Sequence, residues 1–161
     1  MKQRIMVWSD KQRDACQRAA ALCSRSERSP GSIEQKLHDW GLAEEEARPV
    51  LERLVHEKFI DQERFARSFV RDKFRFNKWG KIKLAFHLKA EKIAPDIIRS
   101  ALEEIGDEVY HETLVRLLTE KDKSVKALNL YDRKAKLFRF AQSRGFETDL
   151  IYSALAEMVG D

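Results

Sequence analysis

The sequence has few of the residues that interrupt helices. It contains only six glycines and three prolines among 161 residues, whereas charged residues make up 36% and apolar residues 43%. Glycine and proline are the strongest local interruptions of regular structure, and leucine, alanine, glutamate, lysine and arginine, which dominate here, all favour the helix. This balance of charge and apolar residues is typical of a folded globular protein and excludes a disordered chain. We therefore expect an all-α fold.

Long hydrophobic runs are also missing. No segment approaches the roughly 20 apolar residues that span a bilayer, and the amino-terminal MKQRIMVWSD has basic residues without the apolar stretch of a secretory signal. We expect no membrane partner and a cytoplasmic location. The two cysteines, Cys16 and Cys23, are seven residues apart on an expected helix, which separates them by about 10 Å along its axis, too far for a disulfide. With no histidine at ligand spacing, they are interpreted as small buried hydrophobes.

Motifs of enzyme chemistry are lacking as well. The chain has no GxxxxGK[ST] phosphate loop and no GxGxxG. Its four histidines, which are His38, His56, His87 and His111, are scattered and fit surface or half-buried helix positions better than the role of a catalytic base. The carboxylates of residues 44–46 open an expected helix, where they favour the positive end of its dipole. The prediction is a protein that is not an enzyme and needs no cofactor or metal.

What the sequence does contain is one unit in three copies. The segment IEQKLHDWGLAEEEARPVLERL from Ile33 aligns without gaps with LAFHLKAEKIAPDIIRSALEEI from Leu84 and with LFRFAQSRGFETDLIYSALAEM from Leu137. Apolar residues coincide, and repetition at a fixed period indicates stacked structural repeats. The further matching columns are Leu42, Ile93 and Phe146; Ala47, Ile98 and Ile151; Leu51, Leu102 and Leu155; and Leu54, Ile105 and Met158.

Each copy is predicted to form a helix, a turn and a second helix. Gly41 and Gly145 follow the first helix, as a glycine in a left-handed C-cap does. The middle copy has Lys92 at this place, so its cap is expected to be strained or replaced by another turn. Pro49 predicts a kink or a late start for a helix that would otherwise begin at Ala43, because proline removes a backbone hydrogen bond and clashes one turn back.

A further helical stretch precedes each pair, so the unit has three helices and about 50 residues. A unit of that size buries too little apolar surface to be comfortably stable alone, and stacked units share a core. We predict an all-α, elongated, curved array of three tandem three-helix repeats. The additional helices are expected at residues 10–27, 61–76 and 107–127, and the predicted divisions are an N-terminal tail 1–9 and repeats 10–58, 59–106 and 107–161.

Positive charge is concentrated in the middle of the chain. Between residues 61 and 99, eleven lysines or arginines accompany five aspartates or glutamates, an excess of six where the whole chain carries only +4. On a helical wheel, arginines spaced three and four apart lie opposite Phe65, Phe69 and Phe76, while Lys73 falls within the apolar face and Phe74 outside it. The candidate partner-binding residues are Arg64, Arg67, Arg71, Arg75, Lys78, Trp79, Lys81 and Lys83.

This basic stripe has two interpretations. It is either a solvated helix face or a binding surface, and the scarcity of acidic residues at four-residue spacing favours the second. Such a surface suits the phosphates of DNA and a carboxylate-rich protein equally well. Trp79 could stack on a base or anchor a protein interface, although core packing is the commoner use of a tryptophan.

The same region resembles a known family. The residues that match its pattern D-x-E-R-F-A-x-x-F-V-R are Asp61, Glu63, Arg64, Phe65, Ala66, Phe69, Val70 and Arg71. Lys78, Gly80 and Lys81 resemble the continuation of that pattern, and the segment from Leu137 to Phe146 resembles L-x-R-F-x-x-x-R-G-F. The chain is similar, over residues 10 to 159, to the RecX family of recombination regulators. It departs from the family at Lys92 and in the lead-in at residues 29–32.

The resemblance implies three tandem three-helix repeats and a role in DNA recombination, DNA repair and the SOS response. It implies a non-enzymatic regulatory protein that binds the groove of the RecA–DNA filament as a monomer and negatively modulates RecA. The basic stripe is then the candidate contact with the filament. The alternative is a helical-repeat protein that binds single- or double-stranded DNA without sequence preference. Sequence-specific reading of DNA is disfavoured because the expected third helices begin with acidic segments such as AEEEARP.

Overall fold

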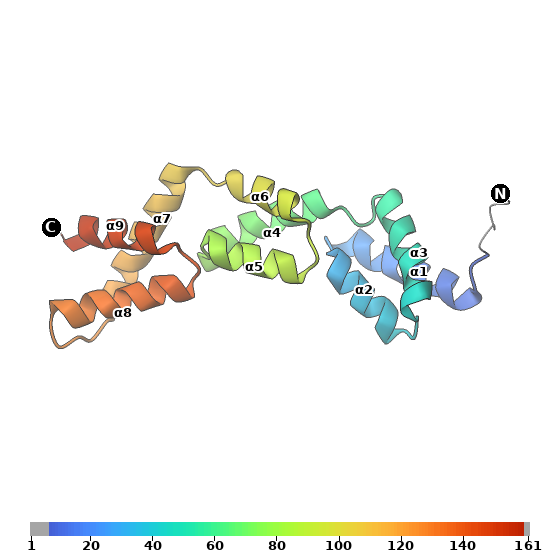
Figure 1. Cartoon of the computed structure of the whole chain (residues 1–161), viewed down its shortest axis with the longest axis horizontal. Coiled ribbons are helices and arrows are strands. Elements are labelled where there is room, and N and C mark those ends of the chain that lie inside the picture. Colours follow the sequence, from blue (N-terminus) through green and yellow to red (C-terminus); the bar gives the residue numbers. More distant parts are fainter. Residues whose placement is uncertain (1–6, 160–161) are drawn as a thin grey trace. The chain divides into compact units, whose positions relative to one another are not determined.

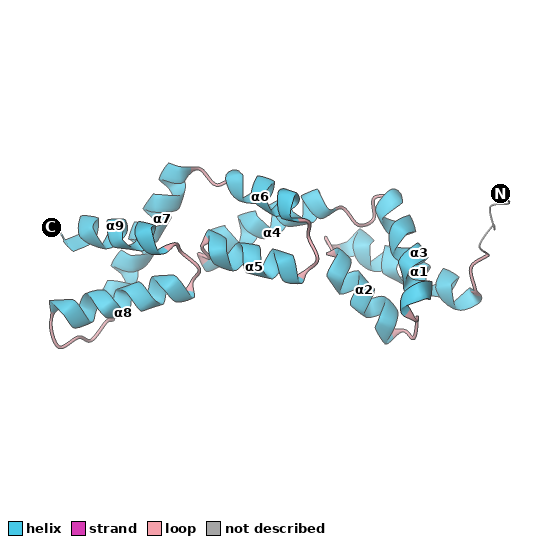
Figure 2. Ribbon diagram, viewed as in Figure 1, coloured by secondary structure: helices cyan, strands magenta, loops and turns pink. Residues whose placement is uncertain are grey.

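The computed structural model describes residues 7–159, and in this part of the chain helices are joined by loops and turns without any strand, as predicted (Figure 1; Figure 2). The first six residues of the predicted tail and the last two of the third predicted repeat lie outside the described residues. None of the helices in residues 7–159 combines the length and apolar character needed to cross a bilayer. The helices are α1 Asp10–Arg25, α2 Pro30–Asp39, α3 Glu44–His56, α4 Gln62–Asn77, α5 Lys81–Ala90, α6 Pro95–Glu103, α7 Asp107–Asp122, α8 Leu130–Ser143 and α9 Thr148–Val159.

Polar side chains fix where several helices begin. The Ser9 hydroxyl accepts a hydrogen bond from the Gln12 amide at 3.1 Å, and the Gln12 side-chain oxygen accepts one from the Ser9 amide at 2.9 Å. This reciprocal pair satisfies two of the amides that a helix start leaves without partners. Ser29 caps α2 and Asn129 caps α8 in the simpler way, each accepting from one amide of the first turn.

The matching columns of the three copies form the cores. Ile33, Leu84 and Leu137 are completely buried, and Leu42, Ile93 and Phe146 are nearly so. These buried residues belong to the second helix of each copy, with Ile33 in α2, Leu84 in α5 and Leu137 in α8. The apolar periodicity of the sequence therefore marks the residues that hold each triplet together.

The turn between the second and third helix of each copy uses a left-handed residue. Gly41 and Gly145 have φ angles of 92° and 93°, and Lys92 takes the same kind of conformation at 63°. Of the two expectations for Lys92, the strained cap is therefore the one observed, at a cost of about 1 kcal/mol for a side chain in this region. Of the two expectations for Pro49, the late start is wrong, because α3 begins at Glu44 and continues through the proline, and the kink stays a prediction.

The chain divides into two compact units. Unit 1 contains the chain up to Phe65 together with Ala90–Ala94, and unit 2 contains Ala66–Lys89 and the chain from Pro95 onward. The core of unit 1 includes Leu37 and Leu54, and Trp8 from the predicted tail packs against it. Cys16 and Cys23 are free thiols at the edge of this core, and burial raises the pKa of both.

Within each unit, the beginning of the second helix of one copy forms hydrogen bonds with the turn between the second and third helices of the following copy. In unit 1 the Gly31 amide donates to the Glu91 carbonyl at 3.1 Å. In unit 2 the Gly80 amide donates to the Arg144 carbonyl at 2.7 Å, and the Ile82 amide donates to the Gly145 carbonyl at 3.0 Å. Backbone hydrogen bonds therefore take part in the contact that joins successive repeats. The division into units does not follow the division into copies.

Candidate functional site

Helix α4 presents three arginines on its exposed side. Its first turn is closed by the Asp61 carboxylate, which accepts from the Arg64 amide at 3.0 Å. Arg67, Arg71 and Arg75 then follow at intervals of four residues, and all three are exposed. Residues four apart lie one above another on a helix. We call these three residues the arginine row.

The arginine row makes little use of its charge within the protein. Arg71 is 3.8 Å from a Glu104 carboxylate oxygen, with both side chains largely exposed, and such surface pairs contribute at most about 1 kcal/mol. The Arg75 guanidinium lies 5.4 Å from the centre of the Phe76 ring. No ion pair joins Arg67 or Arg75 to any residue between 7 and 159. The row can therefore receive anionic groups from a partner with little competition from this chain.

Arg64, which the sequence placed in the same stripe, is used differently. Its guanidinium forms an ion pair with Glu27, lies 3.9 Å from an Asp61 carboxylate oxygen and donates to the Lys58 carbonyl at 3.2 Å. Arg64 thus ties the start of α4 to the segment after α1, within unit 1. We do not count it among the residues available to a partner.

Trp79 is half-buried in a cluster of aromatic and basic side chains. Its ring centre lies 4.6 Å from that of His87 and 6.1 Å from that of Phe69, the latter in an edge-on geometry. The ammonium groups of Lys83 and Lys73 lie 4.6 and 5.0 Å from the same ring. Contacts of this kind contribute about 0.5–1 kcal/mol each. Trp79 is therefore mainly a packing residue, and the two lysines are held along its ring.

The remaining two lysines of the stripe adjoin the turn between α4 and α5. Lys78 has a left-handed φ of 55°, and its ammonium donates to the Arg75 carbonyl at 2.6 Å. The Lys81 ammonium lies 4.9 Å from the ring of Tyr110, whose hydroxyl accepts from the Lys81 amide at 2.8 Å and donates to Glu147. Burial, and then the bond to Glu147, raise the pKa of Tyr110.

The predicted apolar face of α4 is wrong in its last turn. Phe76, assigned to the buried side, is 71% exposed, whereas Phe74, assigned to the outside, stacks on Tyr110 with ring centres 5.9 Å apart. In this turn Phe74 contacts Tyr110 of α7, so the buried direction differs from that of the earlier turns. A helical wheel uses the sequence of one helix only, so it cannot take account of a contact with a residue more than 30 positions further along the chain, such as Tyr110.

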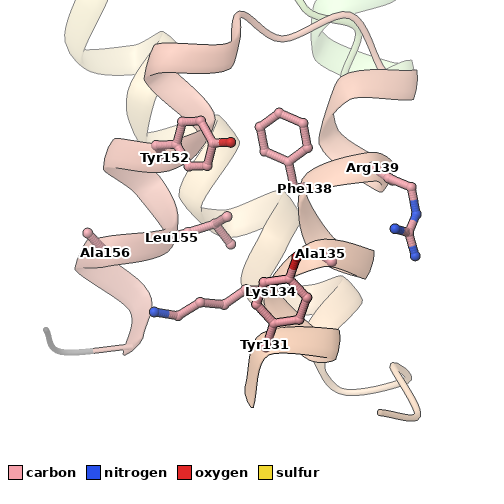
Figure 3. Close-up of a pocket in the computed structure, with 8 residues that line it drawn as sticks. All are labelled: Tyr131, Lys134, Ala135, Phe138, Arg139, Tyr152, Leu155 and Ala156. Atoms are coloured by element: carbon pink, nitrogen blue, oxygen red, sulfur yellow. The ribbon is translucent and has the colours of Figure 1, made fainter. Parts of the chain in front are cut away.

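A second surface feature escaped the sequence interpretation. A hollow of about 370 Å³ lies between α8 and α9, and Figure 3 shows Phe138 and Tyr152 side by side above Leu155. The rings of Phe138 and Tyr152 stack with centres 5.0 Å apart. Tyr131 lies at the margin of the hollow and is 85% exposed. The sequence did contain a sign of this hollow. In the repeat alignment Phe138 stands where the first copy has the polar residue Glu34, so the third copy has an aromatic ring at a column that the core does not need to be apolar.

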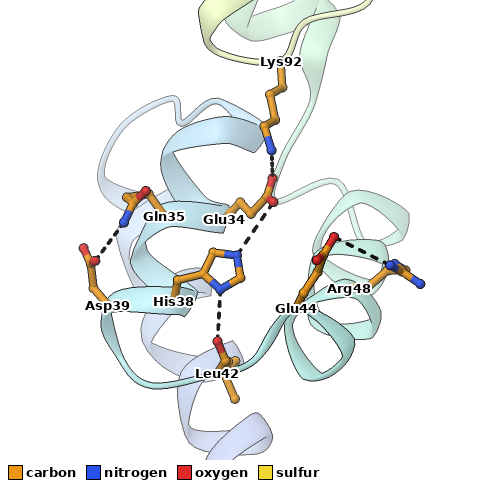
Figure 4. A network of polar contacts seen from close by, with 8 residues as sticks. All are labelled: Glu34, Gln35, His38, Asp39, Leu42, Glu44, Arg48 and Lys92. Atoms are coloured by element: carbon orange, nitrogen blue, oxygen red, sulfur yellow. Dashed lines mark hydrogen bonds and ion pairs between the residues drawn. The ribbon is translucent and has the colours of Figure 1, made fainter.

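The corresponding surface of the first copy is a polar network (Figure 4). Glu34 accepts from the Lys92 ammonium at 2.6 Å and lies 3.8 Å from His38 Nε2, and His38 Nδ1 is 3.0 Å from the Leu42 carbonyl oxygen. Arg48 lies 3.8 Å from Glu44. The four histidines are half-buried or exposed, as predicted. Between residues 7 and 159, no group of three or more histidine, cysteine, aspartate or glutamate side chains is placed to hold a metal ion.

Comparison with known proteins accounts for the three copies. Family models for the first, second and third three-helix domains of RecX match residues 15–54, 61–102 and 108–155. These segments fall inside the three predicted repeats and confirm that there are three tandem three-helix domains. The boundaries of the repeats stay predictions.

Several proteins called regulatory protein RecX are similar to the chain. The one from Prosthecochloris aestuarii is 30% identical over 149 residues, which cover 91% of this chain and 95% of the relative. The one from Pelodictyon phaeoclathratiforme is 29% identical, over 88% of this chain and 86% of the relative. The one from Lactobacillus johnsonii is 29% identical over 84% of this chain, but the chain spans only half of that relative.

Solved structures show the same fold. The crystal structure of RecX from Lactobacillus salivarius is similar with a TM-score of 0.80, at 20% identity, over 94% of this chain and 99% of the other. A second crystal structure, of a regulatory protein RecX, is similar with a TM-score of 0.82, at 25% identity, over 94% of this chain and 72% of the other. Because models of all three RecX domains match in order and cover most of the chain, this protein belongs to the RecX family.

Proposed function

We propose that this protein is a non-enzymatic regulator that binds the RecA–DNA filament and lowers the ATP hydrolysis and strand exchange of RecA. Membership of a family whose members are called regulatory proteins supports the regulatory role. The arginine row supports a polyanionic partner, and it is the observation on which the choice of surface depends. A filament offers both the phosphates of DNA and the carboxylates of its protein subunits.

The spacing of the arginine row suits a repeating anionic partner. Four residues of helix rise about 6 Å, so Arg67, Arg71 and Arg75 span about 12 Å along α4. A planar guanidinium can bind a phosphate or a carboxylate through two parallel hydrogen bonds. Since the ion pair of Arg71 with Glu104 is loose and is the only one that the row makes with residues 7–159, binding would require little rearrangement of this part of the protein.

The test is the DNA-dependent ATP hydrolysis of RecA at increasing amounts of this protein. We expect hydrolysis to fall. Loss at amounts well below that of RecA would favour the capping of filament ends, and loss at one protein per RecA would favour coating of the groove. Unchanged hydrolysis and unchanged strand exchange at saturating amounts of protein would refute the proposal.

A triple variant separates the arginine row from the rest of the molecule. Replacing Arg67, Arg71 and Arg75 by alanine should raise the concentration for half inhibition about tenfold, because each exposed charge pair contributes about 0.2–1 kcal/mol and three are removed. Since the three side chains are exposed, far-UV circular dichroism should not change. The matched control replaces three exposed cations of unit 1 by alanine, namely Lys11, Arg25 and Lys36. Equal potency of the triple variant and the control would remove the row from the proposed contact.

Binding of DNA without sequence preference is the alternative, and the same row favours it. In that case the protein should bind a labelled duplex in the absence of RecA. The affinity should fall with salt at a slope of about −0.9 for each phosphate contact, or about −2.7 for three contacts. In the triple variant the affinity for DNA should depend much less on salt concentration. Regulation through RecA instead predicts that the protein binds the filament more tightly than it binds the same DNA alone.

A further inference from the structure

The hollow between α8 and α9 has the properties of a side-chain binding site. Its walls are the stacked rings of Phe138 and Tyr152, its floor includes Leu155, and Tyr131 stands at its edge (Figure 3). Tyr152 is 61% exposed although it belongs to the stacked pair. A volume of about 370 Å³ accommodates one or two large apolar side chains.

The first copy of the repeat shows that the fold does not need these aromatic residues. With the alignment that matches Ile33 to Leu137, Phe138 corresponds to Glu34 and Tyr152 corresponds to Arg48. The floor is unchanged, because Leu155 corresponds to Leu51. The first copy thus builds the same helix pair with an acidic and a basic residue at the positions where the third copy has the half-buried ring of Phe138 and the exposed ring of Tyr152.

Exposed aromatic residues that the fold does not require indicate a partner. Isolated surface hydrophobes are common, but three aromatic rings around one hollow form a contiguous apolar patch, and such patches mark interaction sites. Phenylalanine and tyrosine are also among the residues enriched in the centres of protein interfaces.

The charges around the hollow restrict the chemistry of the partner. Among the described residues that line it, Lys134 and Arg139 are basic and none is acidic. Lys134 extends toward α9 in Figure 3. The one acidic residue in the last two turns of α9, Glu157, is directed to His111 of α7, with Nε2 and Oε2 2.6 Å apart. Apolar walls with a basic margin complement an acidic segment that carries an apolar side chain.

We propose that the α8–α9 hollow binds an aromatic or leucine side chain of an acidic protein segment. This inference depends on the proposed function in one respect, because it assigns that segment to a subunit of RecA. A nucleobase fits less well, since Phe138 and Tyr152 each direct one ring face at the other and the Leu155 floor offers no hydrogen-bond partner to a base edge.

The chain supplies the substitution that tests this site. Phe138→Glu combined with Tyr152→Arg introduces the pair that the first copy already carries, so the fold has an internal precedent. We expect the dissociation constant for the RecA filament, measured by fluorescence anisotropy, to rise on the order of thirtyfold, the change for loss of a dominant interface anchor. The matched control, Val7→Glu with Val55→Arg, replaces two exposed apolar residues of unit 1 and should bind as the wild type does.

The design distinguishes failure of this site from failure of the proposed function. Wild type that binds and inhibits RecA, with the double variant equally tight, would refute the site and leave the function standing. Wild type that does not bind RecA at all would refute both. If the double variant loses helicity, Tyr131→Glu serves in its place, because that ring is mostly in solvent, and a change below about threefold would count against the site.

A cross-linking measurement identifies the chemistry of the bound segment. A photoreactive phenylalanine at position 131, irradiated with the RecA filament, should attach to a RecA peptide of net negative charge, identified by mass spectrometry. Attachment to DNA would replace the proposed protein segment by a nucleic acid. Attachment to a RecA peptide of net positive charge would overturn the proposed complementarity.

Discussion

Replacing Gly80 with alanine is expected to break a close backbone contact within unit 2. A Cβ atom added at Gly80 would lie 2.4 Å from the carbonyl carbon and oxygen of Gly145 and 2.5 Å from the Phe146 nitrogen. These neighbours are backbone atoms, so no side-chain rotation can relieve the clash. The turn between α8 and α9 must move, and the hydrogen bonds from the Gly80 and Ile82 amides break with it.

The magnitude follows from the contacts that are lost. Two hydrogen bonds contribute about 1 kcal/mol each, and an added methyl group in a close-packed site costs typically 1–3 kcal/mol. We expect Gly80→Ala to lower the free energy of unfolding by about 3–5 kcal/mol. This is a large part of the roughly 5–15 kcal/mol by which a domain is stable. The variant is therefore expected to unfold at a much lower urea concentration.

The measurement is urea denaturation followed by far-UV circular dichroism. The control is Gly106→Ala, because a Cβ atom at Gly106 meets nothing within 4 Å and the residue only precedes α7. Loss of a glycine N-cap costs at most about 1 kcal/mol. If the two variants lost equal stability, the contact between the start of α5 and the α8–α9 turn would not stabilise unit 2, and the repeat-to-repeat contact described above would be incorrect.

Two further predictions concern pH. Since burial and the bond to Glu147 raise the pKa of Tyr110, the folded state keeps a proton that the unfolded state releases above pH of about 10. Stability should therefore fall as pH rises past about 10, and urea titrations should show less of this fall in Tyr110→Phe than in wild type. The hydrogen bonds from Arg133 lower the pKa of Asp122, so this pair stabilises the fold above pH of about 4 and is lost as pH falls below it. In Asp122→Asn the free energy of unfolding should fall less between pH of about 4 and lower pH than in wild type, by about 1 kcal/mol or less. An equal fall in the two proteins would contradict the pairing.

The fold could be predicted because its main constraint is periodic. The column of Ile33, Leu84 and Leu137 recurs at fixed shifts, and burial of one member entails burial of the others when the copies have the same structure. The conformation of Lys92 could not be predicted in the same way. The Gly31 amide binds the carbonyl of Glu91, and the Lys92 ammonium pairs with Glu34, so the strained turn is held by residues about 60 positions earlier in the chain.

The candidate surface could be predicted only where it depends on one helix. The spacing of Arg67, Arg71 and Arg75 places them on one side of α4 whatever else the protein does, and the structure exposes all three. Arg64 has the same local spacing, but its guanidinium is paired with Glu27, and nothing in the sequence of α4 identifies that partner. The local periodicity of a helix predicts on which side of the helix a residue lies. It does not predict which residues of other elements contact that side.

The repeat offers a way around this limit, because its copies serve as controls for one another. Columns that stay apolar in every copy, such as Leu51, Leu102 and Leu155, are explained by packing and carry little information about function. Columns that change from Glu34 to Phe138 while the helix pair is preserved have no such explanation. Glu34 and Phe138 are both half-buried, so the shared fold accepts either side chain at this column, and the difference is available for binding. The differences between the copies, more than their common pattern, therefore distinguish the surfaces that we propose for contact with a partner.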